Sequence, residues 1–156
     1  MLKNLIELTK LRIGFLVLVT TIIGFYLGSQ GQIDLSLLLF TIIGTLLSST
    51  GSSVMNNVIE SESDKLMERT KNRVLPTKKV SLLSAKIIGF AFIISGLLIL
   101  NFKVNSLTCI LSLITIFSYL FLYTPLKRKS WLNTSVGAIP GALPPLGGWT
   151  AATGSL

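Results

Sequence analysis

The stretch "NNVIESESDKLMERTKNRVLP", residues 56–76, places oxygen-bearing side chains at helical spacing. Asn56, Glu60 and Asp64 are four residues apart, so they share one face of a helix, and Asn57 lies beside them. Like charges at this spacing destabilise an isolated helix by about 0.2–0.5 kcal/mol, so helix propensity does not explain them. Binding of Mg²⁺ would explain the row of acids, because Mg²⁺ prefers oxygen ligands and commonly joins one or two carboxylates to substrate phosphates. We therefore expect Asn56, Glu60 and Asp64 to form a Mg²⁺ site.

Two arginines follow the acids. Arg69 and Arg73 are also four residues apart and would share a face if this segment is helical. Guanidinium groups bind phosphate oxygens in a forked geometry and neutralise a departing phosphate. Acids and then arginines, at the mouth of an apolar bundle, predict a substrate with a diphosphate head and a lipid tail. The spacing alone leaves an alternative open: a solvated loop beside the membrane, whose exposed ion pairs contribute only about 0–1 kcal/mol each.

The rest of the chain must position these residues, and its composition is that of a membrane protein. Of the 156 residues, 50% are hydrophobic and 13% are charged, with a mean hydropathy of +0.73. A bilayer core of about 30 Å needs a helix of about 20 residues. Long stretches without a charged side chain are Ile13–Ile33, Leu35–Ile59, Ile87–Phe102, Val104–Leu126 and Ser130–Leu156.

These stretches predict an all-α fold, a polytopic transmembrane helical bundle, in which residues 1–156 belong to a single domain. The third stretch is short, but Lys86 and Lys103 flank it and extend their ammonium groups to the membrane interface. The spans are expected at about residues 13–31, 35–58, 85–102, 106–124 and 132–151.

The positions of lysine and arginine predict the orientation. If the N-terminus is cytoplasmic, 13 of the 14 basic residues lie inside and only Lys103 lies outside. The acid-rich stretch is then cytoplasmic too. The net charge of +8 follows from this topology and from attraction to anionic lipid or substrate, so it requires no nucleic acid. No arginine-rich, acid-poor presequence precedes the first span, so we expect a bacterial inner (plasma) membrane.

The last apolar stretch, "VGAIPGALPPLGGWTAATG", differs from the others. Gly137 and Gly141 form a small-xxx-small face suited to close helix contact. Pro140, Pro144 and Pro145 remove backbone donors, so the helix should kink or break. Irregular backbone at membrane depth is tolerated against protein or a cavity, which predicts a helix that lines a cavity. An ordinary, tightly packed helix is the alternative.

The acidic stretch resembles the N-x-x-x-D-x-x-x-D motif of the 4-hydroxybenzoate polyprenyltransferase superfamily, the UbiA-type intramembrane prenyltransferases. "MERTKNRVLP" is similar, more narrowly, to the protoheme IX farnesyltransferase (haem O synthase) family. So are "LTKLRIGFLVLVTTIIGFYLG" and "TPLKRKSWLNTSVGAIPGALPPLGGWTAATGS", and the pieces follow the expected order along the whole chain. Two departures are conservative: Glu60 stands where the superfamily has Asp, and Leu11 replaces the usual proline of the first motif.

The resemblance implies transfer of farnesyl from farnesyl diphosphate to a vinyl group of protoheme IX, which gives haem O. It implies Mg²⁺ as cofactor, with haem as substrate, and membrane lipid and haem A synthase or oxidase assembly proteins as partners. The residues it assigns to catalysis are Asn56, Glu60, Asp64, Arg69 and Arg73. Further diphosphate contacts are assigned to Asn57, Lys127 and Arg128.

The length of the chain differs from that of the family. Family members are about twice as long, with about nine helices and a second acidic motif. We therefore expect the chain to be an N-terminal part that is inactive alone. Two alternatives stay open: a prenyltransferase of the same superfamily with an aromatic acceptor such as 4-hydroxybenzoate, and a non-catalytic membrane protein.

Overall fold

The structure, a computed structural model, describes residues 2–127 and 130–156. Within these ranges the chain forms helices and no strand, which confirms the predicted all-α class. Two helices continue into π-helical turns, labelled η1 and η2. The elements are α1 (Leu2–Thr9), α2 (Leu11–Gly28), α3 (Leu35–Asp64), α4 (Leu82–Ile99), η1 (Leu100–Val104), α5 (Ser106–Phe117), η2 (Ser118–Tyr123), α6 (Thr124–Leu126) and α7 (Asn133–Thr153).

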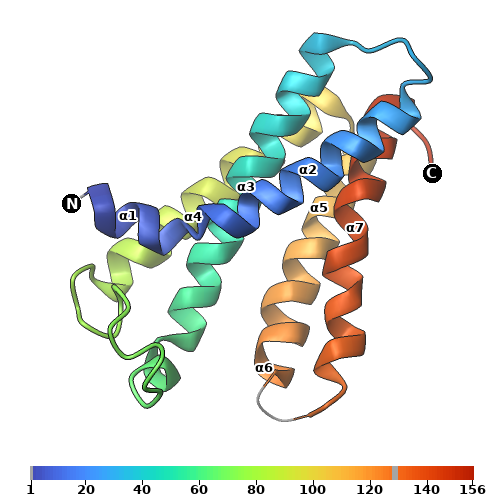
Figure 1. The fold of residues 1–156 in the computed structure, drawn as a ribbon. Coiled ribbons are helices and arrows are strands. Elements are labelled where there is room, and N and C mark those ends of the chain that lie inside the picture. The colour runs from blue at the N-terminus through green and yellow to red at the C-terminus, as the bar shows by residue number, and fades with distance from the viewer. Residues whose placement is uncertain (1, 128–129) are drawn as a thin grey trace.

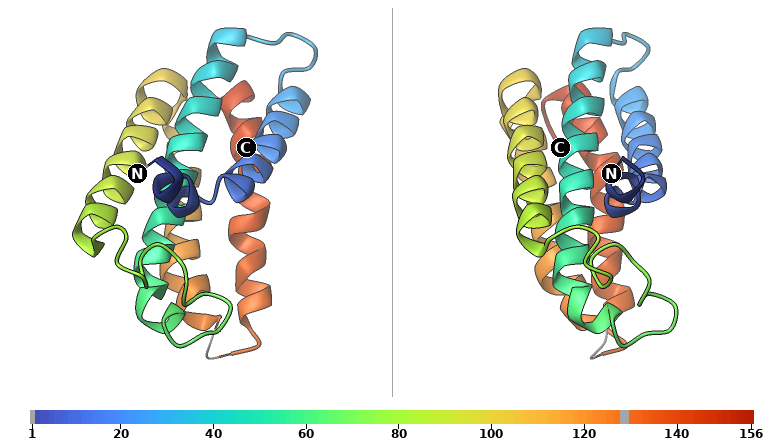
Figure 2. Two further views of the ribbon diagram at one scale, coloured as in Figure 1. Left: turned by 60° about the vertical axis from the view of Figure 1, so that its left-hand side comes forward. Right: turned by 90° about the vertical axis from the view of Figure 1, so that its left-hand side faces the viewer.

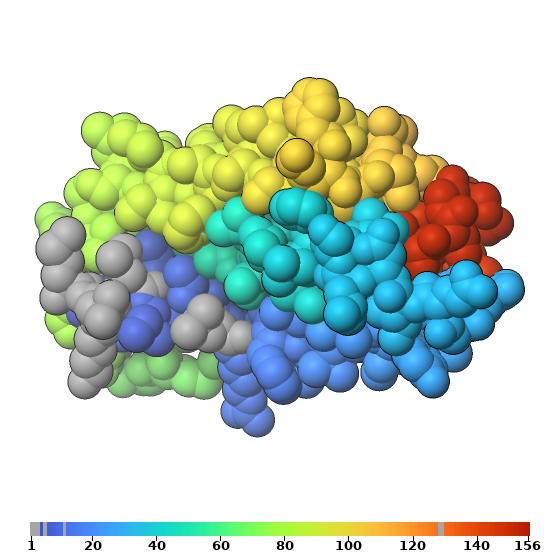
Figure 3. Space-filling model, turned by 90° about the horizontal axis from the view of Figure 1, so that it is seen from above, coloured from blue at the N-terminus to red at the C-terminus, as the bar shows by residue number. Residues whose placement is uncertain are grey.

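The long helices run side by side, and α3 is the central one (Figure 1). It packs against α4 on one side and against α2 on the other, and α2 packs in turn against α7. Figure 2 shows the same arrangement from two further directions. From above, α3 again lies between α4 and α2 (Figure 3).

The connections separate into two ends. The loop of residues 65–81, α6 and the start of α7 lie at the same end of the bundle, and the turn from α2 to α3 lies at the other (Figure 1). Lys103 lies in η1, with its ammonium 5.8 Å from the centroid of the Phe40 ring near the start of α3. The basic loop and Lys127 therefore share one end, away from Lys103.

Three helical stretches are long and apolar enough to cross a membrane: Leu35–Asp64, Leu82–Val104 and Ser106–Leu126. The apolar part of α2, Arg12–Gly28, is shorter. The chain therefore has membrane-spanning helices, while the expected count of five spans stays a prediction.

Glycines let the backbones of α3 and α4 approach closely. A Cβ added at Gly51 would lie 2.6 Å from the carbonyl oxygen of Gly89, and one at Gly96 would lie 2.7 Å from that of Gly44. No side chain fits in these places. Small residues at such positions are typical of helix pairs in membranes, where close backbone packing replaces the hydrophobic effect as the main attraction.

The last helix does not break at its prolines, while the predicted kink stays a prediction. Helix α7 is one element with Pro140, Pro144 and Pro145 inside it. Pro140 and Pro144 line a cavity, and backbone that lacks some of its hydrogen bonds is tolerated there. The prediction that this helix lines a cavity is confirmed.

The expected close contact of α7 occurs at Gly137, where a Cβ would lie 2.9 Å from the Tyr123 ring, but not at Gly141, and a tighter contact lies at Gly148. A Cβ at Gly148 would overlap the Thr21 carbonyl oxygen of α2. A Cβ at Gly137 would meet only the ring of Tyr123, and one at Gly141 would meet nothing within 4 Å. Gly141 therefore opens the cavity, and Gly148 makes the tighter helix contact.

Candidate functional site

The row of predicted site residues on α3 is buried. Asn56, Glu60 and Asp64 are only 3%, 4% and 3% exposed. Helix α3 reaches them because it continues for 30 residues, beyond its apolar part, as far as Asp64. Burial to this degree argues against a solvated loop, because isolated carboxylates are not buried without partners.

Each carboxylate has a cationic partner from another part of the fold. Arg73 Nη1 lies 2.7 Å from Asp64 Oδ2, and Lys127 Nζ lies 3.2 Å from Glu60 Oε1. The Thr70 hydroxyl donates to the backbone carbonyl of Asp64 at 3.1 Å and ties the loop of residues 65–81 to the end of the helix. In this arrangement the acids are neutralised by the same cations that could bind a phosphate.

Lys10 joins this cluster, although the sequence predicted for it only a role in topology. It lies between α1 and α2 with a left-handed backbone (φ 48°), and its ammonium donates to Asn56 Oδ1 at 2.9 Å. Burial lowers the pKa of Lys10 to about 8, with a further lowering by Arg73 and a partial opposing effect of Glu60. No local signal distinguishes Lys10, because its partner is 46 residues away in the chain.

The arginine pair is arranged differently from the prediction. Residues 65–81 form turns rather than a helix up to the start of α4, so Arg69 and Arg73 do not share a helix face. Both nevertheless line the same cavity. Arg73 is half-buried and Arg69 is exposed. Arg128, predicted as a diphosphate contact, lies outside the described residues.

The two neighbouring asparagines make different hydrogen bonds. Asn56 Nδ2 donates to Thr124 Oγ1 at 2.9 Å, and that hydroxyl donates onward to the Tyr119 carbonyl at 2.7 Å. Asn57 Nδ2 donates to the Leu8 carbonyl at 2.8 Å. The Oδ1 atom of Asn57 is buried and has no hydrogen-bond partner among the residues that the structure describes.

Asn56, Asn57 and Asp64 border a cavity of about 730 Å³, which we call the charged cavity, whereas Glu60 is not among its lining side chains. Its walls come from α1, the end of α3, the loop of residues 65–81 and η2. Its lining side chains are Ile6, Glu7, Leu8, Lys10, Arg12, Ile13, Asn56, Asn57, Asp64, Arg69, Arg73, Val74, Leu75, Pro76, Tyr119, Tyr123 and Lys127. A cavity of this size is in the range of small-molecule binding sites.

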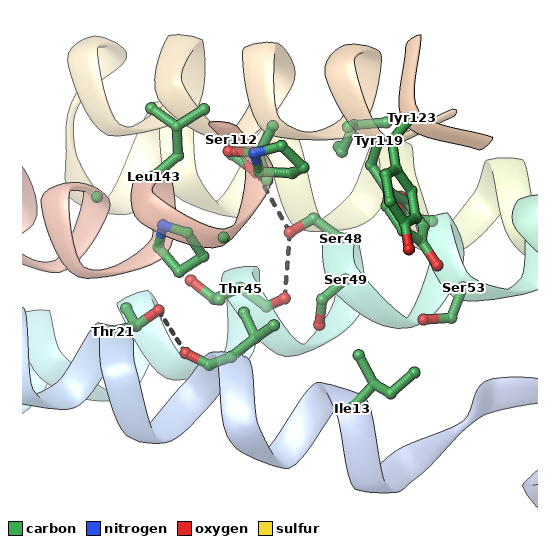
Figure 4. Close-up of a pocket in the computed structure, with 18 of the residues that line it drawn as sticks. Ile13, Thr21, Thr45, Ser48, Ser49, Ser53, Ser112, Tyr119, Tyr123 and Leu143 are labelled. Carbon is green, nitrogen blue, oxygen red and sulfur yellow. Dashed lines mark hydrogen bonds between the residues drawn. The ribbon is translucent and has the colours of Figure 1, made fainter. Parts of the chain in front are cut away.

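A second cavity of about 600 Å³ adjoins it, which we call the hydroxyl-lined cavity (Figure 4). Its walls come from α2, α3, α5, η2 and α7. Many lining residues carry a hydroxyl group: Thr21, Thr45, Ser48, Ser49, Ser52, Ser53, Thr108, Ser112, Thr115, Tyr119, Tyr123 and Thr134. Nothing in the sequence singles out these serines and threonines, which carry no charge and repeat no motif.

The two cavities meet at shared side chains. Ile13, Tyr119 and Tyr123 line both of them. The tyrosine rings are stacked, with centroids 5.8 Å apart and an angle of 15° between their planes. A charged chamber therefore opens beside a largely uncharged one, with an aromatic pair at the junction.

The donor set fits a metal ion held through a substrate rather than by protein alone. No group of three or more His, Cys, Asp and Glu residues that could hold a metal occurs in the described ranges. Mg²⁺ bound through phosphates needs only one or two carboxylates. Glu60, Asp64 and the unpaired oxygen of Asn57 offer oxygen ligands of the required kind.

Comparison with known proteins agrees with this architecture. Residues 17–156 match the model of the UbiA prenyltransferase family. The chain belongs to this family. A protein of Solibacter usitatus named protoheme IX farnesyltransferase is 43% identical, over 99% of this chain and 56% of its own length. The Aquifex aeolicus protein of that name is 44% identical, over 99% of this chain and 53% of its own length.

Two further comparisons extend the likeness. The mitochondrial protoheme IX farnesyltransferase of Homo sapiens is 45% identical, over 97% of this chain and 34% of its own length. A solved structure described as digeranylgeranylglyceryl phosphate synthase superposes with a TM-score of 0.87, over 96% of this chain and 53% of that chain. Its identity is 21%, so it supports the fold alone. The chain spans about half the length of the bacterial relatives that it matches.

Proposed function

We propose that this chain binds farnesyl diphosphate for transfer of the farnesyl group to a vinyl group of protoheme IX, which gives haem O. One observation carries the proposal: the charged cavity and the hydroxyl-lined cavity meet at Ile13, Tyr119 and Tyr123. An amphiphile with a diphosphate head and an apolar tail fits this pair of chambers. The names of the relatives support farnesyl as the donated group and protoheme IX as the acceptor.

The cations of the charged cavity would hold the diphosphate. Arg73 forms an ion pair with Asp64, and Lys127 forms one with Glu60. A diphosphate in the cavity would compete with these carboxylates for the same N–H groups. Lys10 and the exposed Arg69 line the same space and add charge. As the allylic C–O bond breaks, its electron pair goes to the diphosphate, and these groups stabilise the negative charge that develops there.

Glu60 and Asp64 would hold Mg²⁺ together with the diphosphate. Bound there, the metal would supply Lewis-acid stabilisation of the leaving group. The carboxylates are positioned by α3 and held in place by Lys127 and Arg73.

The hydroxyl-lined cavity would hold the farnesyl chain and exclude water. Because water is excluded there, it cannot react with the allylic farnesyl cation before the acceptor does. Tyr119 and Tyr123 line both cavities. They would therefore lie beside the reacting carbon, which joins the diphosphate to the farnesyl chain.

The charges support a proposed membrane orientation. The chain is membrane-embedded, and we propose a bacterial inner membrane with the charged cavity at the cytoplasmic side. The support is that the basic loop of residues 65–81 and α6, which Lys127 directly follows, share one end of the bundle (Figure 1). Haem A synthase or oxidase assembly proteins as partners stay a prediction from the family resemblance.

A chimera tests the function. Residues 1–156 replace the matching part of the Aquifex aeolicus relative, and membranes are supplied with farnesyl diphosphate, Mg²⁺ and either protoheme IX or 4-hydroxybenzoate. We expect haem O from protoheme IX and no product from the phenol. Prenylated 4-hydroxybenzoate instead would assign the chain to the aromatic acceptors, and an inserted, folded chimera without any product would support a non-catalytic role.

A further inference from the structure

The residues that line the hydroxyl-lined cavity form a stripe along each of its long helices. On α3 the stripe runs from Ser53 to Thr45, and on η2 and α5 it runs from Tyr119 to Thr108. Figure 4 shows this order, with Tyr119 and Ser53 toward one side of the view and Thr45 farther along α3. Tyr119 also lines the charged cavity, so Thr45 and Thr108 mark the far end of the hydroxyl-lined cavity.

Contacts between helices close this far end. Leu100 of η1 lines the cavity and is 1% exposed, and a Cβ at Gly44 of α3 would lie 2.7 Å from its Cδ2 atom. The hydroxyl groups of Thr108 and of Thr150 in α7 lie 3.0 Å apart. One turn beyond the stripe on α3, Thr41 is fully buried. The cavity therefore ends at a floor of packed side chains, and Leu100 is a large apolar side chain of that floor.

The distance to this floor matches one length of prenyl chain. Tyr119 and Thr108 are 11 residues apart on the consecutive helices α5 and η2, or about 16 Å at a rise of about 1.5 Å per residue. An extended carbon chain with bonds of about 1.5 Å advances about 1.3 Å per bond, so a farnesyl main chain spans about 14 Å and a geranylgeranyl chain about 20 Å. The first fits between the tyrosine and the floor in extended form, and the second does not.

We propose that Leu100 and the floor around it select the length of the prenyl donor, so that the site prefers farnesyl to a longer chain. A tail whose head is held in the charged cavity can extend only as far as the floor. A longer tail must fold back or displace side chains that are already packed, which is unfavourable in a filled interior. This inference rests on the proposed function, because the head of the donor must bind in the charged cavity first.

Two substitutions should move the floor in opposite directions. Leu100→Ala removes the apolar side chain and lengthens the cavity. Gly147, one turn before Thr150, also lines the cavity, and a Cβ there would meet nothing within 4 Å, which leaves room for Gly147→Leu to shorten the cavity. Leu120→Ala is the matched control, because Leu120 is also buried, at 4% exposed, and is not among the side chains that line either cavity.

Binding of prenyl thiolodiphosphates, which resist loss of the diphosphate group, tests the proposal without an activity assay. The chain is reconstituted in nanodiscs with Mg²⁺, and calorimetry gives the Kd for the geranyl, farnesyl and geranylgeranyl compounds. We expect the wild type to bind the farnesyl compound about tenfold more tightly than the geranylgeranyl compound, and Leu100→Ala to remove most of this preference. Partition of each ligand into the lipid is the same for every variant, so it cancels in these comparisons.

The other two variants complete the test. Gly147→Leu should raise the Kd for the farnesyl compound about tenfold and the Kd for the shorter geranyl compound less than about threefold. Leu120→Ala should keep the wild-type preference, because the space that it opens lies away from both cavities.

Equal affinity of the wild type for the farnesyl and geranylgeranyl compounds would overturn the proposal, since the tail would then not end at the floor. An unchanged preference in Leu100→Ala, or the same loss of preference in Leu120→Ala, would overturn it too. If Leu100→Ala does not fold by circular dichroism, Gly147→Leu decides, and an equal rise in the Kd for the geranyl and farnesyl compounds is the contrary result. A wild-type chain that binds none of the three compounds instead contradicts the proposed function.

Discussion

The two adjoining cavities are built from different chemistry although they share a wall. The charged cavity collects ionic groups from segments far apart in the sequence, as in the pair Lys127–Glu60, 67 residues apart. The hydroxyl-lined cavity is built from small side chains on long helices (Figure 4). The first chamber can recognise charge, and the second can recognise size and shape.

Some hydroxyl groups of the second cavity are satisfied by their own helices. Ser48 donates to the Thr45 carbonyl at 3.1 Å, Ser49 to that of Leu46 at 3.1 Å, and Thr115 to that of Leu111 at 2.7 Å. Such bonds to the preceding turn occupy the hydroxyl proton. The Ser52 hydroxyl, in contrast, is buried and has no partner among the described residues. A wall rich in serine and threonine provides space because the side chains are small.

The largest expected effect is at the acids. Asp64→Asn in the chimera removes a carboxylate that would hold Mg²⁺ together with the diphosphate. We therefore expect haem O formation to fall by about 10²–10³-fold, with membrane insertion unchanged. The measurement is haem O quantified by chromatography.

Glu62→Gln is the matched control for this change. Glu62 lies on the same helix, but its side chain is 75% exposed and pairs with Lys65 at 2.7 Å. We expect activity within about twofold of the wild type, since exposed pairs contribute little. Equal losses in the two variants would contradict the assignment of the site.

The two arginines should differ in their contribution. Arg73 is half-buried and lies on Asp64, while Arg69 is exposed. We expect Arg73→Ala to weaken binding of inorganic diphosphate by about 10–100-fold, the range for hydrogen bonds to charged groups, and Arg69→Ala by less than about fivefold. Isothermal titration calorimetry with Mg²⁺ present measures both. A greater loss at Arg69 would show that the loop of residues 65–81 rearranges when the anion binds.

Filling the hydroxyl-lined cavity should affect only the tail. Gly141 lines this cavity, and a Cβ there would meet nothing within 4 Å. We expect Gly141→Leu to raise the Kd for farnesyl diphosphate by about tenfold, or about 1.4 kcal/mol, because the added side chain takes the space of the farnesyl tail. Binding of inorganic diphosphate by the same variant is the internal control. If both ligands lose affinity equally, the two cavities do not divide head from tail.

The smallest expected effect is on stability, at two adjacent glycines of α7. Gly148→Ala would place a Cβ against the Thr21 carbonyl oxygen, where there is no room for it, so we expect destabilisation of about 1–3 kcal/mol. Gly147→Ala meets nothing within 4 Å and should be neutral, or stabilising by up to about 1 kcal/mol through helix propensity. Thermal unfolding in detergent measures the pair. Equal melting temperatures would contradict the close packing of α7 on α2.

The sequence could predict what is local. Apolar stretches indicated the helical class, and the spacing of Asn56, Glu60 and Asp64 correctly predicted a shared helix face at the end of α3. The same rule was wrong for Arg69 and Arg73, because the chain there forms turns after α3 ends at Asp64. Helical spacing is informative only where the helix persists.

What the sequence could not predict depends on contacts between distant segments. Lys10 enters the site because the left-handed turn between α1 and α2 brings it to Asn56. The free oxygen of Asn57 appears only once the Leu8 carbonyl has taken its NH₂ group. Gly148 replaces Gly141 as the packing glycine because α2 lies against that side of α7. None of these follows from residue type or spacing.

The most direct test of the central claim is to locate the tail of a bound prenyl diphosphate. A farnesyl diphosphate analogue with a photoreactive diazirine at its last isoprene unit is bound to the reconstituted chain, irradiated, and mapped by mass spectrometry. We predict that the label attaches to residues of the hydroxyl-lined cavity, such as Thr45, Ser49 and Leu143, and that excess farnesyl diphosphate prevents the labelling. Labelling of exposed residues such as Phe15, Phe90 and Phe102, unaffected by the competitor, would contradict the account.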